Sequence, residues 1–238
     1  RMISLWPVRT GVLVEDGILY ATAGIFPYEG IYVAAVNANT GKQIWMNDTA
    51  GDQAWGLLYG GMAPQGYLVA SANSLFVPTG RSMPAEFDKR TGKYKRFLNA
   101  GGKIGGSWTM IDGNELFAGV ANQGTDTKIT FDLNSGKSLG DRFSRYPSID
   151  MVLSTDTAYI ATRKGIFGID RAANLKANSA VPALDKESTA LVKTIAAIRK
   201  LQKAAGDKPE ELKKLNADLA KAATRLAVIN KEKAALNG

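Results

Sequence analysis

The stretch Ile31-Tyr-Val-Ala-Ala-Val-Asn-Ala-Asn-Thr-Gly-Lys-Gln-Ile-Trp45 decides the fold, because degraded copies of it recur along the chain. It joins a run of β-branched and aromatic residues, which favour strands, to a turn that contains Asn and Gly-Lys. The later copies are Phe87-Asp-Lys-Arg-Thr-Gly-Lys-Tyr-Lys-Arg-Phe97, Phe131-Asp-Leu-Asn-Ser-Gly-Lys137 and, without the Gly-Lys turn, Gly165-Ile-Phe-Gly-Ile-Asp170. A repeat of about 40 to 50 residues built from short strands is typical of propeller blades or another β-array.

A second short motif precedes each copy: a strand, a tight turn and another strand that carries an aromatic residue. The aromatic residues are Tyr20, Phe76, Phe117 and Tyr159, which lie 56, 41 and 42 residues apart. Four-stranded units at this spacing favour a propeller over a sandwich, whose strands do not repeat as a unit. We therefore expect residues 1–178 to form about four blades, with the fourth strand missing from the last.

The turns of the repeat have recognisable chemistry. Gly41, Gly92 and Gly136 stand where a short hairpin loop needs a positive φ, which glycine adopts without a Cβ clash. The residue that opens each turn has a side-chain oxygen that can accept hydrogen bonds from backbone amides inside the turn. We interpret the turn residues as structural; the opening residues are Asn37, Asp88, Asp132 and, at the end of the fourth copy, Asp170.

Composition excludes several function classes. The chain of 238 residues has no His and no Cys, which rules out Ser-His-Asp hydrolysis, cysteine nucleophiles and thiolate or imidazole metal sites. Catalysis would have to use carboxylates, Lys, Tyr, Arg or an oxygen-ligated metal. The net charge is +8, but anions are interleaved with the cations, so we expect solvated faces and no nucleic-acid partner. No apolar run approaches the ~18 residues of a membrane-spanning helix. The chain opens on Arg1, and we expect it to be a piece of a longer product.

Residues 179–238 have a helical period. Apolar residues Leu184, Leu191, Ile195, Ile198 and Leu201 are expected on one face of a first helix. Gly206 can close that helix, Asp207 can cap a second one, and Pro209 is tolerated in its first turn. We predict an antiparallel αα-hairpin with arms of about 35 Å, at about 1.5 Å per residue. The second seam has alternating spacings of three and four residues: Leu212, Leu215, Leu219, Ala222, Leu226 and Ile229.

With the repeats aligned, residues 11–177 resemble the PQQ-like, or quinoprotein-like, β-propeller repeat. Copy one matches its Asp/Asn, Thr-Gly, Lys and closing Trp in Asn37, Thr40-Gly41-Lys42 and Trp45. The next two copies have Phe97 and Leu139 near the Trp position. The resemblance implies that Trp45 packs between neighbouring blades and is structural.

The family that the chain resembles divides in function. Some members are alcohol or sugar dehydrogenases that hold the quinone PQQ and Ca²⁺ at the propeller centre, and many others are non-catalytic. The vicinal Cys pair of many of those enzymes is absent, and no Glu/Asn/Asp calcium set can be matched. The sequence looks closest to the non-catalytic kind in large multi-domain bacterial proteins, which implies a periplasmic, extracellular or cell-envelope location. We expect a non-enzymatic scaffold with no cofactor; the alternative is a PQQ- and Ca²⁺-dependent oxidoreductase or a small-ligand-binding propeller.

Four repeats are fewer than the rings of this family, which close with about seven or eight blades. We favour the account in which the hairpin interrupts the fourth blade and a further segment of the same polypeptide, or another chain, completes the ring. A homodimer of two half-rings is the other account. A ligand, if one binds, is expected at the channel mouth, where loops enter the innermost strands. The candidate residues there are Arg9, Gln65, Ser107 and Trp108.

Overall fold

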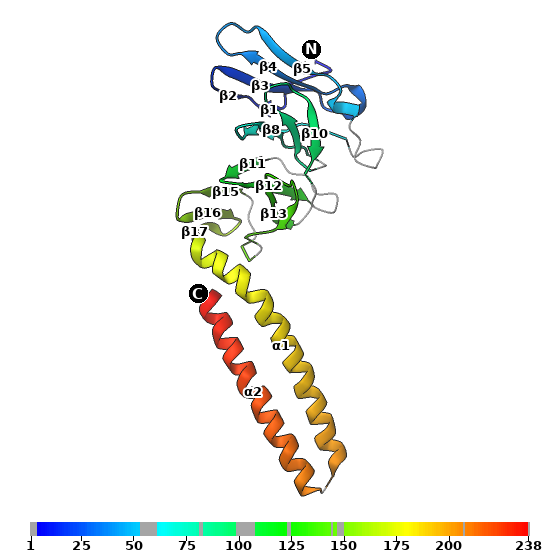
Figure 1. Ribbon diagram of the computed structural model, residues 1–238, viewed down its shortest axis with the longest axis vertical. Coiled ribbons are helices and arrows are strands. Elements are labelled where there is room, and N and C mark those ends of the chain that lie inside the picture. Colours follow the sequence, from blue (N-terminus) through cyan, green and yellow to red (C-terminus); the bar gives the residue numbers. More distant parts are fainter. Residues whose placement is uncertain are drawn as a thin grey trace. The chain divides into compact units, whose positions relative to one another are not determined.

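The structure is a computed structural model that describes residues 4–52, 61–80, 83–98, 108–122, 125–143, 145–146, 150–206 and 208–237. It is mainly β, with small antiparallel sheets followed by two long helices (Figure 1). The described residues fall into two compact units. The first is residues 1–153 with 159–167, and the second is residues 154–158 with 168–238.

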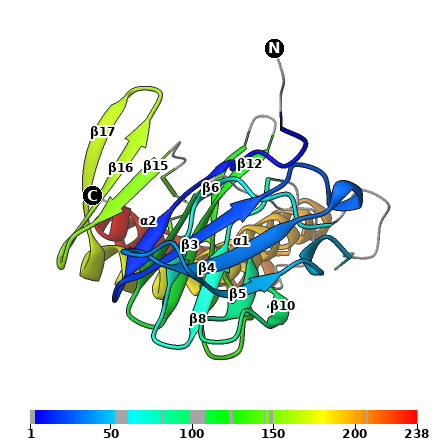
Figure 2. The same ribbon diagram turned by 90° about the horizontal axis from the view of Figure 1, so that it is seen from above.

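Three sheets of the first unit each have four antiparallel strands in chain order, and we call them blades one, two and three. Figure 2 shows β3, β4 and β5 of blade one side by side. The strands of blade one are β2 (Leu13–Glu15), β3 (Ile18–Ala23), β4 (Tyr32–Asn37) and β5 (Gln43–Asn47). Those of blade two are β7 (Val69–Ala70), β8 (Ser74–Val77), β9 (Ala85–Asp88) and β10 (Tyr94–Phe97). Those of blade three are β11 (Trp108–Asp112), β12 (Glu115–Asn122), β13 (Thr125–Asp132) and β14 (Ser138–Gly140).

The fourth repeat forms a three-stranded sheet of β15 (Asp150–Leu153), β16 (Thr157–Thr162) and β17 (Gly165–Asp170). Within the described residues it has no fourth strand, in agreement with the sequence. Elsewhere, β1 (Thr10–Gly11) pairs in parallel with β6 (Gly66–Tyr67). Two single-turn 3-10 helices complete the first unit, η1 (Pro27–Glu29) and η2 (Ala50–Asp52).

Side chains alternate between the two faces of a strand, and blade two shows the consequence. Leu75 and Val77 of β8 belong to a core cluster shared with blade one, whereas Phe76 between them belongs to a cluster shared with blade three. All four residues of β8 are buried. Blade two is therefore packed on both faces, which is how stacked blades bury a continuous apolar core.

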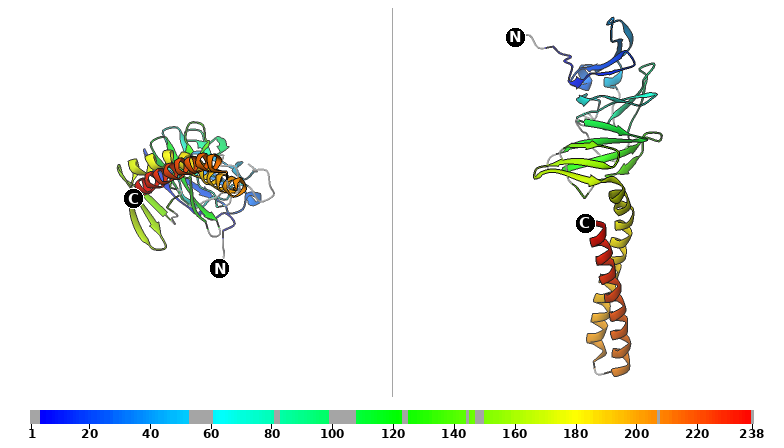
Figure 3. Two further views of the ribbon diagram at one scale, coloured as in Figure 1. Left: turned by 90° about the horizontal axis from the view of Figure 1, so that it is seen from below. Right: turned by 90° about the vertical axis from the view of Figure 1, so that its left-hand side faces the viewer.

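Helices α1 (Arg171–Ala205) and α2 (Pro209–Asn237) lie side by side as an antiparallel hairpin, visible in Figure 1 and in the right-hand view of Figure 3. At about 1.5 Å per residue their arms are about 52 and 44 Å long, more than the sequence suggested. The α2 seam is as predicted, from half-buried Leu212 to fully buried Ile229, and it continues through Lys233. Gly206 follows α1 with a φ of 56°, whereas Asp207 lies outside the described residues.

The start of α1 differs from the boundary at residue 178 that the sequence suggested. The helix begins at Arg171, because the Asp170 side chain accepts a hydrogen bond from the Ala173 amide at 2.7 Å and caps the helix. Pro182 lies inside the helix, where it removes one backbone donor.

One seam residue of α1 was also predicted wrongly. Leu201 is 55% exposed, and the buried face passes instead through Ile198, Gln202 and Ala205. The spacing from Ile198 to the next inward position is four residues, not three. The Gln202 amide donates to Asn216 Oδ1 at 2.7 Å, so a polar pair occupies the position expected for Leu201.

No helix of the described residues is long and apolar enough to cross a membrane.

Candidate functional site

The hairpin turn between the third and fourth strands of blades one, two and three has one repeated geometry. In blade one, Asn37 Oδ1 accepts from the amides of Asn39 and Thr40, at 3.1 and 2.8 Å, and from the Thr40 hydroxyl at 2.9 Å. The turn glycine, Gly41, has a φ of 68° and donates to the Asn37 carbonyl at 2.8 Å. The side-chain bonds fix the turn, and the left-handed residue requires glycine.

Blades two and three repeat this turn with an aspartate. Asp88 Oδ1 accepts from the Thr91 amide and hydroxyl, both at 2.8 Å, and Asp132 Oδ1 accepts from the Ser135 amide and hydroxyl, both at 2.7 Å. Hydrogen bonds to the charged form, first from the Thr91 hydroxyl for Asp88 and from the Ser135 amide for Asp132, lower the pKa of each carboxyl. These carboxylates are occupied as turn acceptors.

The joint between blades one and two is made by Trp45 of β5 on the turn of blade two. The indole Nε1 donates to the Lys89 carbonyl at 3.1 Å, and Asn47 Nδ2 donates to the Gly92 carbonyl at 2.8 Å. A Cβ at Gly92 would overlap the Trp45 ring. Gly92 is therefore needed twice, for its φ of 72° and for the close approach of the indole. Trp45 itself is 9% exposed.

The joint between blades two and three uses Arg96, the residue before the Phe97 that the sequence alignment put near the Trp position. The strand register decides this. Arg96 of β10 pairs with Glu86 of β9, and in blade one Trp45 of β5 pairs with Ala35 of β4 at the equivalent position. Phe97 is one residue further along the strand. Gly140 of blade three, not Leu139, holds the same position by its pairing with Thr130.

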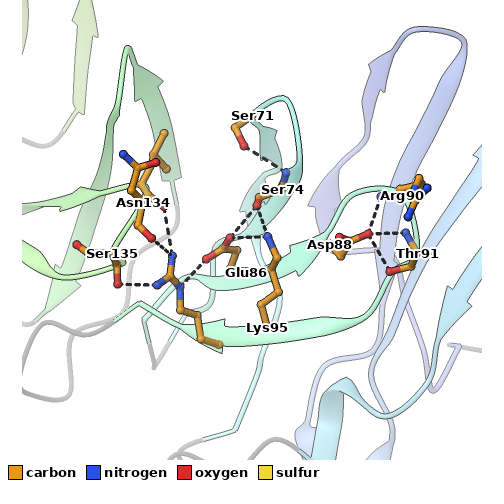
Figure 4. Close-up of polar contacts among 11 residues, drawn as sticks. Ser71, Ser74, Glu86, Asp88, Arg90, Thr91, Lys95, Asn134 and Ser135 are labelled. Carbon is orange, nitrogen blue, oxygen red and sulfur yellow. Dashed lines mark hydrogen bonds and ion pairs between the residues drawn. The ribbon is translucent and has the colours of Figure 1, made fainter.

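Figure 4 labels Asn134 and Ser135 of the turn of blade three, together with Glu86 of blade two. Arg96 contacts this turn as Trp45 contacts the turn of blade two. Its guanidinium donates to the carbonyls of Leu133, Asn134 and Ser135 at 3.2, 3.2 and 2.5 Å. Leu133 directly follows Asp132, which opens the turn of blade three. In the turn of blade two, Lys89, whose carbonyl accepts from Trp45, holds the same place after Asp88. A Cβ at Gly136 would lie 2.6 Å from Arg96 Cζ, so a planar group again covers a glycine.

A buried carboxylate holds Arg96 in place. Glu86 is 3% exposed; its Oε2 accepts from Arg96 Nε at 2.6 Å, and its Oε1 accepts from Ser74 Oγ at 2.7 Å and Lys95 Nζ at 3.1 Å. Burial acts to raise the pKa of Glu86, but the bonds from Ser74, Arg96 and Lys95 outweigh it and the pKa is lowered. A carboxylate with both oxygens bonded and a lowered pKa is a poor general base, so this cluster is built for attachment.

A pocket of about 550 Å³ opens beside this cluster. Its lining is mostly polar and comes from blades two and three. It includes Ser71, Asn73, Glu86, Lys95, Asn114 and Asn134. The pocket has amide and ammonium groups that can hydrogen-bond a small polar molecule, but its carboxylate is already bonded.

Blade three and the fourth repeat lack both parts of such a joint. Gly140, at the docking position of blade three, has no side chain. In the fourth repeat, the residues after Asp170 form α1 where the other repeats have a turn glycine. Asp170 Oδ1 accepts from the amide three residues on, as the opening residues of the turns do, and the chain then continues as helix.

Two of the four candidate channel-mouth residues are in contact. Arg9 Nη2 donates to Gln65 Oε1 at 3.2 Å, next to the parallel pair β1 and β6. Trp108 opens β11, where a Cβ at Gly119 of β12 would overlap its indole. Ser107 lies outside the described residues. β11, which Trp108 opens, contacts β6 close to Gln65, where the Thr109 hydroxyl donates to the Tyr67 carbonyl at 3.2 Å. Ligand binding here stays a prediction.

Across the described ranges, no three acidic side chains lie close enough together to hold a metal ion. The PQQ and Ca²⁺ of the alternative interpretation stay predictions that the resemblance implies.

The outer face of blade one is apolar and exposed. It consists of Val14, Leu19, Ala21, Ala34, Val36 and Met46, which the register aligns on one face. Val14 is 57% and Met46 49% exposed, and the other four are partly exposed. Their counterparts in blade two are Leu75, Val77, Ala85 and Phe87, all fully buried against blade one. The corresponding face of blade three is also buried, by packing on blade two.

Comparison with known proteins adds the following. No protein-family model and no curated protein matches this sequence. Among solved structures, the computationally designed Ika4 protein is 13% identical, with a TM-score of 0.49 over 69% of this chain and 91% of its own. The designed Ika8 protein is 14% identical, with a TM-score of 0.48 over 68% of this chain and 45% of its own. BamB from Moraxella catarrhalis is 14% identical, with a TM-score of 0.43 over 67% and 44%. The chain thus spans less than half the length of Ika8 and BamB.

Proposed function

We propose that this protein is a non-enzymatic scaffold that assembles with other protein segments through the faces of its blades. The outer face of blade one carries this proposal, since the same face of blades two and three is buried by a neighbouring blade. A strand-rich apolar face of this kind is a protein-interaction or aggregation surface unless it is covered.

The polar clusters among the described residues favour a role in holding neighbouring blades together over a role in catalysis. Asp88 and Asp132 are turn acceptors, and Glu86 is bonded to two cations and a hydroxyl. A binding or catalytic role for the Arg9–Gln65 pair is the weaker alternative. It rests on one hydrogen bond, from the Arg9 guanidinium to the neutral Gln65 amide.

The occupant that we favour for the outer face is further blades belonging to the same polypeptide, or to another chain, that complete a ring. Two copies of this chain closing one ring is the second possibility. A periplasmic or envelope location fits this function and stays a prediction.

Site-specific photocrosslinking in the native cell tests the proposal. A photoreactive residue at Met46 should give a discrete adduct, whereas the same residue at exposed Ser138 on β14 should give none. A second change, Val14→Lys, should remove the Met46 adduct without altering the circular dichroism spectrum. Equal labelling at Met46 and Ser138, or an adduct that survives Val14→Lys, would contradict an interaction role for this face.

A further inference from the structure

The polar pocket of about 550 Å³ between blades two and three is formed largely by three hairpin turns. The turn between β7 and β8 contributes Ser71 and Asn73. The turn between β11 and β12 contributes Asn114, and the turn between β13 and β14 contributes Asn134. Figure 4 shows Asn134 on the left and Ser71 in the centre. The volume lies within the range of about 300 to 1,000 Å³ that is usual for small-molecule sites.

The polar side chains of this pocket have no counterpart at the joint between blades one and two. There, three apolar residues hold the positions that an acid and two cations hold in blade two. By strand register they are Ala35, Ile44 and Trp45, in place of Glu86, Lys95 and Arg96. An apolar set is therefore sufficient to join two blades. Buried ions seldom stabilise a protein more than apolar residues of similar volume, because charges are costly to remove from water. The charged set points to a role besides holding the blades together.

Lys95 is held at the pocket with part of its hydrogen-bonding capacity unused. Its Nζ donates to Ser74 Oγ at 2.8 Å and to Glu86 Oε1 at 3.1 Å, which accounts for two of its three N–H groups. The Lys95 side chain is 38% exposed, whereas that of Glu86 is 4% exposed. Because the buried carboxylate already positions the ammonium group, a ligand does not have to order it.

The charges of the pocket favour an anionic ligand. Its lining has one acid and two cations, a net charge of +1. Both oxygens of the acid, Glu86, already accept hydrogen bonds. The neighbouring Asp132 carboxylate accepts from Asn114 Nδ2 and from the Ser135 amide, so it is occupied as well. The unused N–H of the ammonium is thus the charged group that remains for a ligand, and its strong partners are carboxylates and other anions.

The uncharged part of the lining favours hydroxyl groups on that ligand. Among the described residues, the side-chain amides of Asn73 and Asn134 have no hydrogen-bond partner. Each amide has a donor and an acceptor, which matches the donor and acceptor of a hydroxyl. The apolar residues of the lining are only Ala72 and Leu133, and none is aromatic. A large apolar ligand would therefore find little surface to contact.

We propose that this pocket binds a small hydroxylated carboxylate of the sugar-acid class. Lys95 binds the carboxylate, and the amides of Asn73 and Asn134 bind the hydroxyls. This inference goes beyond the scaffold function, because the outer face of blade one contributes no residue to the pocket. Blades two and three form the site by themselves, so binding does not depend on what covers that face.

Titration of the full chain with D-galacturonate, followed by nitrogen-15 NMR, tests the proposal. The amide signals of Ser74, Gly113 and Asn134 should move, with a Kd of about 1 mM, the affinity that a ligand of this size gains at an ordinary ligand efficiency. D-Galactose, which lacks the carboxylate, should bind at least about tenfold more weakly. Cyclohexanecarboxylate, which has the ring and the carboxylate without hydroxyls, should also bind more weakly.

Three outcomes of this titration would overturn the proposal. The first is no movement of these signals at about ten times the expected Kd. The second is an affinity for galactose or cyclohexanecarboxylate equal to that for galacturonate. The third is displacement of galacturonate by an equal concentration of inorganic sulfate, which would show an adventitious ion only.

Variants separate binding from folding. Lys95→Gln removes the charged donor and should weaken galacturonate binding by at least about tenfold. Lys93→Gln, on the same strand hairpin but outside the pocket lining, is the matched control and should leave the affinity unchanged. Asn73→Ala, at an exposed position, should weaken binding about two- to tenfold without changing the urea midpoint.

A folded Lys95→Gln variant that binds galacturonate as tightly as the parent would refute the assigned role of the ammonium. If that variant does not fold, Asn73→Ala decides the question, since its side chain has no partner among the described residues to lose. Parental affinity of Asn73→Ala would then overturn the proposal.

Discussion

Replacing Arg96 with Met tests how the second and third blades are joined. Met keeps much of the aliphatic stem of Arg96 but removes the guanidinium, whose atoms lie over Gly136. That group makes a 2.6 Å bond to Glu86 and three bonds to carbonyls of the next blade. Glu86 is then left as a 3% exposed carboxylate with Lys95 and Ser74 as its remaining partners.

Breaking a buried ion pair by removing one partner costs about 3 to 5 kcal/mol. The Arg96 side chain is 34% exposed and Lys95 remains, so we expect the lower end, about 3 kcal/mol. Glu86→Gln keeps a polar group for Ser74 and leaves a cation that water can reach, so it should cost about 1 to 2 kcal/mol. The double variant should also cost about 3 kcal/mol, which gives a coupling energy of about 1 to 2 kcal/mol.

Urea unfolding followed by tryptophan fluorescence measures these values for the sheets alone. All four tryptophans, at positions 6, 45, 55 and 108, precede the helices, so the hairpin does not contribute to this signal. Additive costs, within about 0.5 kcal/mol, would refute the argument that Glu86 and Arg96 act as one unit.

The free-energy cost of Arg96→Met should also depend on pH. Because the folded pKa of Glu86 is lowered below 4.5, its ionised form stabilises the sheets above pH 4.5, and this contribution is lost as pH falls through the folded pKa. Without Arg96 the burial of Glu86 is less compensated and its pKa rises, so the carboxyl is neutralised at higher pH. The cost of Arg96→Met should therefore shrink as pH is lowered below about 4.5, and a cost that is constant with pH would contradict this account.

Three further predictions concern the helical hairpin and are checked by circular dichroism at 222 nm during thermal unfolding. Pro182→Ala restores a helix-interior donor and should stabilise α1 by up to about 3 kcal/mol; an unchanged midpoint would show that the helix has already adapted to the proline. Asp170→Ala removes the cap on Ala173 and should cost about 1 kcal/mol, while Asp170→Asn should cost much less. Ile198→Lys places a charge in the seam and should lower the midpoint strongly. Leu201→Lys, at a 55% exposed position, should stay within about 0.5 kcal/mol of the parent, and similar costs for these two would refute the seam described above.

The turns and the α2 seam could be predicted from sequence because their causes are local. A side-chain oxygen three residues before its amide partner is a short-range pattern, and so is the required positive φ of Gly41. The apolar period of α2 likewise shows directly which face is buried.

The joint between blades two and three could not be predicted in this way. The sequence alignment put Phe97 near the position that Trp45 holds in blade one. A strand places neighbouring residues on opposite faces, so an error of one residue exchanged the docking side for the other. Counting four residues from the turn glycine, as Trp45 follows Gly41, finds Arg96. The role of Glu86 depends on packing between blades that are distant in sequence.

The geometry of Asp170 has a consequence for how such a chain can acquire new parts. The same carboxylate position either closes a tight turn or starts a long helix, and the choice depends on the few residues that follow it. A helical arm can therefore be grafted onto a blade without a new start signal and without changing the strands before it. In every repeat that ends in such a residue, evolution or an engineer could insert a helix about 50 Å long by changing only the residues of one turn.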